Sequence, residues 1–391
     1  MKNNLYTFII LALLSVGCQL EISGQYIYRQ PVPLDDGLET GTLEEVGIHP
    51  EKIVQASNKI LNGQFSEVHG LLIFKDDKLV FEEYYKGHKW QWDAPSHHGD
   101  LVEWNGDMLH NIMSATKSIT SACIGIAIDE GFIEHANQSI FDYFPEHQHL
   151  KKDGKERIAI EHLLTMRSGL EWREWSAPYS SAENPIIGIW FQDKDPVSFI
   201  LEKPLVHPPG TQFNYSSGNM VLLGEIIRNA TGMSIDEFSQ QYLFTPLQID
   251  SASWAVKYDN GVDANNLMIT PRAMIKFGAV YMNKGSWKGQ DLIPEAWIDK
   301  SVTPFPGNYR INVPGEPSGR MGYSYSWWTK TYYKYGKRVN MYAASGFGGQ
   351  HIMILPELNT VVAFTGGNYL GRRPPFKILE QYIIPSIRKK L

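Results

Sequence analysis

Segments with β-strand patterning lie at both ends of this sequence and helix-patterned segments lie between them, and this order constrains the fold most. Near the N-terminus, residues 70–74 and 78–81 are β-rich runs on either side of the polar residues 75–77, which predicts a hairpin. A second β-rich block closes the chain, with runs at residues 323–328, 339–344, 351–355 and 360–365. Apolar residues at helical spacing occupy residues 161–166, 219–229 and 271–283, with Gly232 and Gly285 as expected stops.

These patterns predict a mixed α/β (α+β) fold. The two chain ends pair in one antiparallel sheet with flanking helices, and the middle of the chain forms a mainly helical lobe. We expect the sheet lobe to comprise about residues 43–110 and 290–391, and the helical lobe about residues 111–289. A cleft between two such lobes is a common place for a ligand site.

The N-terminal residues resemble a bacterial lipoprotein signal. A basic start precedes an apolar run at residues 8–14, and small residues lead to Cys18. We expect residues 1–17 to be removed, Cys18 to carry a lipid and residues 18–42 to form a tether. This makes the protein an exported, membrane-anchored lipoprotein that faces the periplasm or the cell surface. Ser15 stands where the lipoprotein pattern prefers Leu, so secretion as a soluble protein is the alternative.

The charge of the chain argues against nucleic acid as a partner. The net charge is −6 and the 36 Lys and Arg residues are scattered singly, so no basic face follows a phosphate backbone. Cys123 is the other cysteine, and its apolar neighbours indicate a packing role. We therefore expect no disulfide, no protein partner and contact with a membrane only through the N-terminal lipid.

The strongest local feature for chemistry is the sequence from Ser114 to Lys117. Eleven residues without charge follow it, residues 118–128, which predicts a buried helix. Residues three apart share one helix face, so the Ser114 hydroxyl and the Lys117 amine can meet at the N-terminal end. Burial lowers the pKa of a lysine and makes it a usable base, while backbone N–H groups there can stabilise an oxyanion. The spacing alone also arises by chance, so its context must decide.

Four further stretches supply that context: residues 160–170, 209–219, 265–285 and 344–350. Together with Ser114 and Lys117, their order and spacing resemble the serine β-lactamase and penicillin-binding-protein superfamily, in its class C-like esterase and amidase branch. The resemblance runs from about residue 45 to about residue 385. It implies a β-lactamase/transpeptidase-like fold, an acyl-enzyme mechanism and no cofactor.

The resemblance also implies roles for individual residues. Tyr215 would take the proton of Ser114, as phenolate or through a proton shared with Lys117, and later give it to the leaving group. The backbone N–H groups of Ser114 and Phe347 would form the oxyanion hole. Ser345 and Gly346 would line the strand that receives the substrate. Whether Lys117 or Tyr215 is the operative base stays open, because coupled groups titrate as a pair.

Two departures from the branch narrow the expected activity. Ser217 stands where many members carry Asn; it can still donate a hydrogen bond to a substrate but reaches less far. Ala344 stands where β-lactamases and peptidoglycan enzymes carry a basic residue, so no cation is supplied there for a substrate carboxylate. The run from Ala344 to Gln350 instead resembles the 6-aminohexanoate-dimer hydrolases and related carboxylesterases, which favours a small ester or amide as substrate.

The aromatic residues outside these motifs allow two interpretations, and the histidine pairs have one expected role. Trp172 and Trp175, with Trp190, Tyr179 and Phe191, either form an apolar wall for the substrate or pack an irregular part of the helical lobe. The pairs His97 and His98, and His147 and His149, lack a matching carboxylate cluster or Cys spacing, so we expect solvated surface and no metal site.

The sequence therefore predicts an exported serine hydrolase that cleaves a small ester or amide through a Ser114 acyl-enzyme. The enzymatic alternatives are a peptidoglycan D-aminopeptidase or carboxypeptidase, or a β-lactamase. The non-enzymatic alternative is a silent module that binds a muropeptide or a β-lactam. Retention of Ser114, Lys117 and Tyr215 together argues for an enzyme, because a binding module needs no such set.

Overall fold

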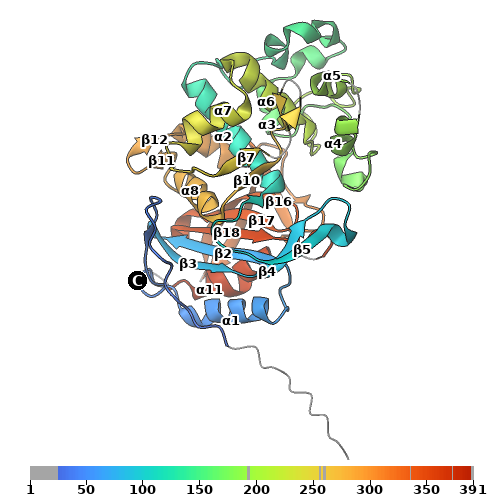
Figure 1. Ribbon diagram of the computed structural model, residues 1–391. Helices are drawn as coiled ribbons and strands as arrows, with labels where there is room; N and C mark the ends of the chain where they lie inside the picture. The colour runs from blue at the N-terminus through green and yellow to red at the C-terminus, as the bar shows by residue number, and fades with distance from the viewer. Residues whose placement is uncertain are drawn as a thin grey trace, which may run out of the picture.

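A nine-stranded sheet built from both ends of the chain forms the base of the molecule (Figure 1). The computed structural model describes residues 25–388 except 192–193, 255–256, 259–260, 335 and 372. Within these ranges the spatial order of the strands is β1 (Glu39–Thr40), β3 (Lys78–Tyr84), β2 (Val68–Lys75), β18 (Thr360–Gly366), β17 (Gln350–Leu355), β16 (Lys337–Gly346), β15 (Trp327–Lys334), β14 (Arg320–Ser324) and β13 (Ile311–Asn312). All neighbours pair antiparallel except β1 and β3. The antiparallel pairing of β2 with β18 joins the two chain ends, which confirms the predicted fold class.

The predicted hairpin is present as β2 and β3, and the closing β-rich block forms β14 to β18. The run at residues 323–328 is not one strand, because the chain turns at Tyr325 and Ser326 with positive φ angles. A second hairpin, β4 (Lys86–Trp90) and β5 (His98–Glu103), projects from the sheet toward the helical lobe (Figure 1).

The helical lobe is centred on α2 (Thr116–Asp129) and α6 (Gly218–Thr231), which pack together. Around them lie α3 (Ile160–Leu164), α4 (Pro185–Gly188), α5 (Pro196–Leu201) and α7 (Ile235–Ser239), while α9 (Glu295–Val302) contacts β14 and β15 of the large sheet. A small sheet of β6 (His110–Asn111), β10 (Leu267–Ile269) and β7 (Ala252–Trp254) connects this lobe to the site. The short hairpins β8 (Lys257–Tyr258) with β9 (Gly261–Val262), and β11 (Ser286–Trp287) with β12 (Gln290–Asp291), complete the strands.

The lobe boundary predicted at residue 289 is wrong for one helix. α8 (Pro271–Met282) packs directly on β18, β17 and β2, so it covers the sheet (Figure 1). Every residue from Pro271 to Tyr281 is buried. Helical spacing of apolar residues indicates burial but does not say which neighbour covers the helix. The opposite face of the sheet carries α1 (Pro50–Leu61), α10 (Pro375–Ile378) and α11 (Ile384–Ser386).

The predicted tether at residues 18–42 is wrong for its described part, residues 25–42. The Tyr26 hydroxyl donates a hydrogen bond to Glu83 at 2.6 Å, and Tyr28 donates to the Val80 carbonyl at 2.9 Å while its ring stacks on Phe81. Tyr26 and Tyr28 are two residues apart, so both rings lie on one side of an extended chain. This spacing indicated packing against the sheet, but the segment is too short to show a longer periodic pattern. Cys18 and the signal residues 1–17 lie outside the described residues.

Candidate active site

Ser114 and Lys117 meet at the start of α2, as their spacing predicts. Ser114 lies in a one-turn 3-10 helix, Met113–Ala115, that leads into α2. The Lys117 Nζ donates a hydrogen bond to the Ser114 Oγ at 3.1 Å. The uncharged helix behind them is buried from Thr116 to Ala127, which fixes both side chains against a rigid element.

Lys117 lies in an environment that favours its neutral form. Its exposed fraction is 2%. Burial lowers the pKa of the amine, and the nearby carboxylates of Glu174 and Asp263 oppose this by raising it. A lysine with a lowered pKa can accept the proton of a neighbouring hydroxyl.

Tyr215 faces the same serine from α6's N-terminal side and packs against two indole rings, which also pack against each other. Its ring stacks on Trp175 at 4.9 Å between centroids and lies parallel to Trp328 at 6.2 Å. Burial raises the pKa of Tyr215 well above its usual value, Tyr323 and Glu174 raise it further, and a hydrogen bond with Ser114 opposes them. Tyr215 is therefore a phenol, not a phenolate, in this environment.

The end of β16 lies against the residues that flank Ser114. A Cβ atom on Gly346 would meet the Ile112 carbonyl oxygen at 2.2 Å and the Ala115 nitrogen at 3.2 Å, so only glycine fits here. This close approach brings Phe347, the next residue, beside Ser114 in the wall of the site. The side chain of Ser345 lines the site as well, and its Oγ lies 3.1 Å from the Nδ1 of His351 on the next strand.

Two cavities meet at Ser114. The larger has a volume of about 740 Å³ and includes Lys117 in its wall, with Ser217 and many aromatic side chains. The smaller has a volume of about 300 Å³ and includes Tyr215, Ser345 and Gly346. Ser114 and Phe347 line both, so a substrate held at the serine can extend into each.

The tryptophans expected to contact substrate separate into two groups. Trp175 lines the smaller cavity and Trp190 the larger, together with Tyr179. Trp172 lines neither cavity, so its predicted role in substrate binding is wrong. It is 4% exposed and packs edge-on against Phe199, and a Cβ on Gly218 would meet its ring at 2.7 Å. Phe191 is 70% exposed to solvent.

Glu174 is a site residue that the sequence reading missed. Its carboxylate accepts hydrogen bonds from Trp172 Nε1 at 2.8 Å, Tyr179 hydroxyl at 2.9 Å, and both the nitrogen and the Oγ of Ser217 at 2.7 Å. It is 1% exposed and lines both cavities. A single acid between Trp172 and Trp175 was the available signal, because a charge inside an aromatic segment indicates a buried, hydrogen-bonded carboxylate.

The network around Glu174 changes what Ser217 can do. Its hydroxyl hydrogen is donated to Glu174, so it offers a substrate an oxygen lone pair and not the hydrogen bond predicted from sequence. The Ser217 carbonyl accepts from Asn265 Nδ2 at 3.1 Å, and the same amide group bonds the buried Asp263 at 2.7 Å. Glu174 and Asp263 belong to different segments of the chain, and the charge of each raises the pKa of Lys117.

A cation does lie in the smaller cavity, although Ala344 supplies none at its own position. Ala344 is fully buried in β16, but Arg373, just before α10, reaches the cavity wall. Its Nη1 donates to Glu316 at 2.6 Å and its guanidinium lies 4.9 Å from the Phe347 ring centroid. Burial raises the pKa of Glu316 to about 7, although Arg373 lowers it. The cation is therefore paired with a carboxyl group that titrates near neutrality.

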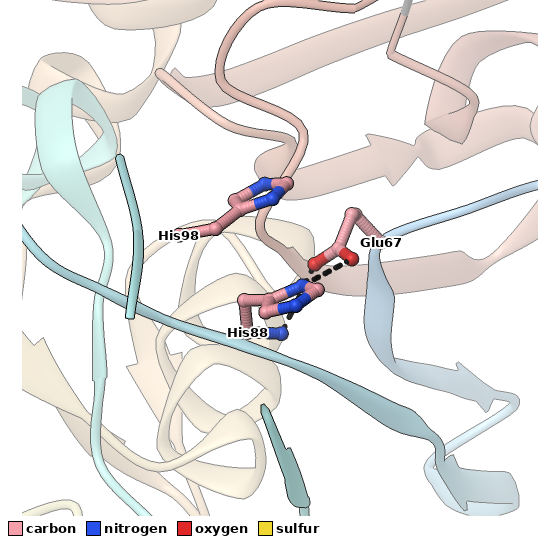
Figure 2. Close-up of side chains that lie close together, drawn as sticks. All are labelled: Glu67, His88 and His98. Atoms are coloured by element: carbon pink, nitrogen blue, oxygen red, sulfur yellow. Dashed lines mark hydrogen bonds and ion pairs between the residues drawn. The ribbon is translucent and has the colours of Figure 1, made fainter. Parts of the chain in front are cut away.

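The prediction of solvated surface is correct for His149, which is exposed, and wrong for His97, His98 and His147, which are buried or half-buried. His97 is 8% exposed and stacks on Trp90 at 4.4 Å. The Nε2 of His147 lies 2.9 Å from a carboxylate oxygen of Asp195. His98 belongs to a cluster with Glu67 and His88, which provides the carboxylate that the sequence did not reveal (Figure 2). Glu67 precedes the pair by more than twenty residues, so no local spacing pointed to it.

Glu67, His88 and His98 could hold a metal ion, since one potential ligand atom from each lies within 4.8 Å of the others. Their present arrangement is one of hydrogen bonds. Glu67 Oε1 lies 2.8 Å from His88 Nδ1, Glu67 Oε2 lies 3.2 Å from the Nε2 of buried His69, and His98 Nε2 lies 2.8 Å from the Gly367 carbonyl. The rings of His88 and His98 stack at 4.4 Å with 1° between their planes (Figure 2). Nitrogen lone pairs lie in the ring plane, so one ring must turn before both could ligate one ion.

The sheet from both chain ends and the helical lobe, with a serine at the start of a buried helix, define a protein of the β-lactamase/transpeptidase-like fold. The chain belongs to the beta-lactamase family, whose sequence model matches residues 64–367.

Several named proteins are similar to this chain. A 6-aminohexanoate-dimer hydrolase of Paenarthrobacter ureafaciens is 24% identical over 270 residues, which cover 66% of this chain and 65% of that protein. A family VIII carboxylesterase has a TM-score of 0.62 at 16% identity, covering 89% of this chain and 98% of that one. A β-lactamase/D-alanine carboxypeptidase from Pseudomonas syringae has a TM-score of 0.61 at 15% identity, covering 86% and 98%. At these identities the solved structures establish the fold alone.

The chain thus spans just under two thirds of the length of the curated hydrolase. In the part of the chain that the structure describes, we find no helix with the length and apolar character needed to cross a membrane.

Proposed function

We propose that the protein is an exported serine hydrolase that cleaves an ester or amide through an acyl-enzyme on Ser114. The observation that carries this proposal is the 3.1 Å hydrogen bond from a buried Lys117 to the Ser114 Oγ, at a point where two cavities meet. Export as a lipoprotein anchored through Cys18 rests on the N-terminal sequence. Nucleic acid is not a partner in this proposal, because the chain carries a net charge of −6.

In the acylation step, the neutral Lys117 amine takes the proton of Ser114 while the Oγ forms a bond to the substrate carbonyl carbon. The backbone N–H groups of Ser114 and Phe347 stabilise the negative oxygen of the tetrahedral intermediate. The bond from carbon to the leaving atom then breaks as Tyr215 gives its phenol proton to that atom. The proton held by Lys117 returns to Tyr215.

The deacylation step uses the same groups in reverse. As the oxygen of a water molecule bonds to the acyl carbon, Tyr215 takes a proton from the water and passes its own phenol proton to Lys117. The bond from carbon to the Ser114 Oγ breaks as Lys117 gives that proton to the Oγ, and the carboxylic acid leaves. The directions of the two pKa shifts, down for Lys117 and up for Tyr215, favour Lys117 as base and Tyr215 as acid.

A carboxypeptidase-type activity is the second candidate, and Arg373 is the observation that favours it. The smaller cavity contains this cation although Ala344 supplies none, and a guanidinium can bind a terminal carboxylate through two parallel hydrogen bonds. The Arg373 guanidinium already donates a hydrogen bond to Glu316. This pairing weakens the case for carboxypeptidase activity and for β-lactamase activity alike. A silent module that binds a muropeptide or β-lactam is the third reading.

The test is intact-mass analysis after incubation with a fluorophosphonate probe, on the wild type and on Ser114→Ala. A p-nitrophenyl ester, a 6-aminohexanoate dimer and nitrocefin serve as substrates. We expect one adduct that is lost in Ser114→Ala, together with ester or amide turnover that falls by at least about 10³-fold in the variant. Folded protein that forms no adduct and turns over no substrate would favour the binding module instead.

A further inference from the structure

The two cavities at Ser114 differ in which proton-transfer group they contain. Tyr215 lies in the wall of the smaller cavity and Lys117 in that of the larger. A general acid must lie within hydrogen-bond reach of the atom that it protonates. Since Tyr215 protonates the leaving atom in the proposed mechanism, the leaving group extends into the smaller cavity. The acyl group therefore extends into the larger one.

The wall of the larger cavity is mostly aromatic and aliphatic. It includes Trp90, Trp92, Trp104, Met108, Ile186 and Trp190. The volume of about 740 Å³ is far more than an acetyl group requires and lies in the range of pockets that hold drug-sized ligands. Each methylene group buried in such a wall strengthens binding roughly fourfold.

The β4–β5 hairpin, which carries Trp90 and leads into Trp92, is fixed in place by the residues of Figure 2. Glu67 precedes β2 of the main sheet, and its Oε1 lies 2.8 Å from His88 of β4. His98 of β5 lies 2.8 Å from the Gly367 carbonyl, at the end of β18. The aromatic wall is therefore held to the sheet from both strands, so little ordering is needed when a substrate binds.

The charged groups of this wall leave little for a charged acyl group to bind. The Glu174 carboxylate is engaged by its hydrogen bonds to Trp172, Tyr179 and Ser217, and the Lys89 side chain is exposed. Burial lowers the pKa of His110 to about 3, so that imidazole is neutral at physiological pH. The wall is thus suited to an uncharged group.

A cluster of three rings, His69, Trp104 and His110, adds polar atoms to this apolar wall. Their centroids lie 4.8 Å apart for His69 and Trp104 and 3.9 Å apart for Trp104 and His110. His69 is 1% and His110 4% exposed. The His69 Nδ1, the Trp104 Nε1 and at least one ring nitrogen of His110 are buried without a hydrogen-bond partner. A buried polar atom without a partner costs free energy, and a bound polar group can relieve it.

We propose that the larger cavity binds the acyl part of the substrate, and that this acyl part is bulky, apolar and tipped with an uncharged hydrogen-bonding group that pairs with the His69–Trp104–His110 cluster. The proposal rests on the serine-hydrolase function proposed above. It assigns the acyl side of the substrate to the larger, aromatic cavity and separates it from the smaller cavity that contains Arg373.

The test compares three p-nitrophenyl esters that share one leaving group: the acetate, the 4-phenylbutanoate and the 4-(4-hydroxyphenyl)butanoate. For the wild type, we expect kcat/KM to rise at least about tenfold from acetate to phenylbutanoate. The hydroxyl group should add a further factor of about 2–10 through one hydrogen bond. Trp90→Ala should reduce the first ratio. His110→Phe and, independently, Trp104→Phe should reduce the second ratio while they keep a ring in place.

Tyr333→Ala is the matched control, because this tyrosine of β15 is 76% exposed and lines neither cavity. It should leave both ratios unchanged. Turnover of acetate without any gain for the larger acyl groups would overturn the acyl assignment and leave the serine-hydrolase function intact. Failure of all three esters together with absence of a fluorophosphonate adduct would instead overturn the hydrolase function on which the assignment rests.

Discussion

The larger and the smaller cavity share Ser114 and Phe347 but differ in chemistry. The larger is lined mainly by indole, thioether and aliphatic groups, and its buried histidine His110 is neutral. The smaller contains a phenol and an arginine–carboxyl pair, Arg373 and Glu316. Ser114 therefore stands between an apolar cavity and a cavity that contains a phenol and an ion pair. The two can be altered separately.

The largest effect should come from Lys117, which serves substrates of every kind because it acts on Ser114 itself. Lys117→Met should lower kcat by about 10²–10⁴-fold for esters and amides alike, since it removes the amine that is hydrogen-bonded to the Oγ. Steady-state kinetics with two acyl groups and two leaving groups measures this. Lys337→Met, at an exposed lysine of β16, is the control. A loss confined to one class of substrate would contradict the assignment of Lys117 as the common base.

The loss of activity on replacing Tyr215 should depend on the leaving group of the substrate. Tyr215→Phe should lower turnover of an anilide by about 10²-fold or more, because an amine leaves only when protonated. A p-nitrophenyl ester should lose much less, because p-nitrophenolate leaves without a proton. The slope of log kcat/KM against leaving-group pKa measures the difference. Equal losses for both substrates would place Tyr215 elsewhere in the mechanism.

Glu316 should make the smaller cavity sensitive to pH. Its pKa is raised to about 7 by burial, so the carboxyl is ionised above pH 7 and then neutralises Arg373. Below pH 7 it is protonated, and the Arg373 charge is available to a substrate carboxylate. Relative to a neutral leaving group, a leaving group that bears a carboxylate should lose about tenfold in kcat/KM between pH 6 and pH 8.

In Glu316→Gln this ratio should stay high and independent of pH. The ratio of two substrates cancels the titration of Lys117, which both share. A wild-type ratio that did not change across this range would show that Arg373 does not contact the leaving group.

The smallest effect should come from Glu67, which fixes only the wall of the larger cavity. Hydrogen bonds from His69 and His88 outweigh burial and lower the pKa of Glu67 to about 2. A lowered carboxyl pKa stabilises the fold above the unfolded-state value of about 4.3, and this stability is lost as pH falls toward 2. Glu67→Gln should lower the free energy of unfolding by about 1.5–3 kcal/mol at pH 7 and flatten its decline in acid.

Urea denaturation at several pH values checks this prediction. Glu103→Gln on the same hairpin is the control, because its side chain is 78% exposed. In Glu67→Gln, the preference among acyl groups should weaken while the dependence on the leaving group stays. A change in the leaving-group dependence would mean that the two sides of the site are coupled.

The features that the sequence predicted well are those set by local geometry. Ser114 and Lys117 meet because residues three apart share a face of a helix. The run of uncharged residues that follows them indicates a buried helix, as the structure has it. The β2–β3 hairpin follows from two β-rich runs around a polar turn. The place of Tyr215 and Phe347 in the wall came through the resemblance to a family, since neither has a local pattern of its own.

The features that the sequence did not reveal depend on contacts between distant segments. Arg373 and Glu316 are 57 residues apart, and no spacing rule joins them. Trp172 and Trp175 lie in one irregular segment, so periodicity could not tell which ring faces a cavity and which packs against Phe199. The apolar pattern of α8 predicted a helix correctly but not that it lies on the sheet.

The pairing of β2 with β18 has a consequence for how the molecule reaches its active form. The paired residues lie far apart in the sequence, by 285 positions for Lys75 and Thr360 and by 298 positions for Val68 and Gly366. Such pairing closes a very long loop, which slows folding and delays it until almost the whole chain has been made. Phe347 of the site is placed by the same late strands. Ser114 therefore meets the end of β16 only late in folding, after the closing strands have paired.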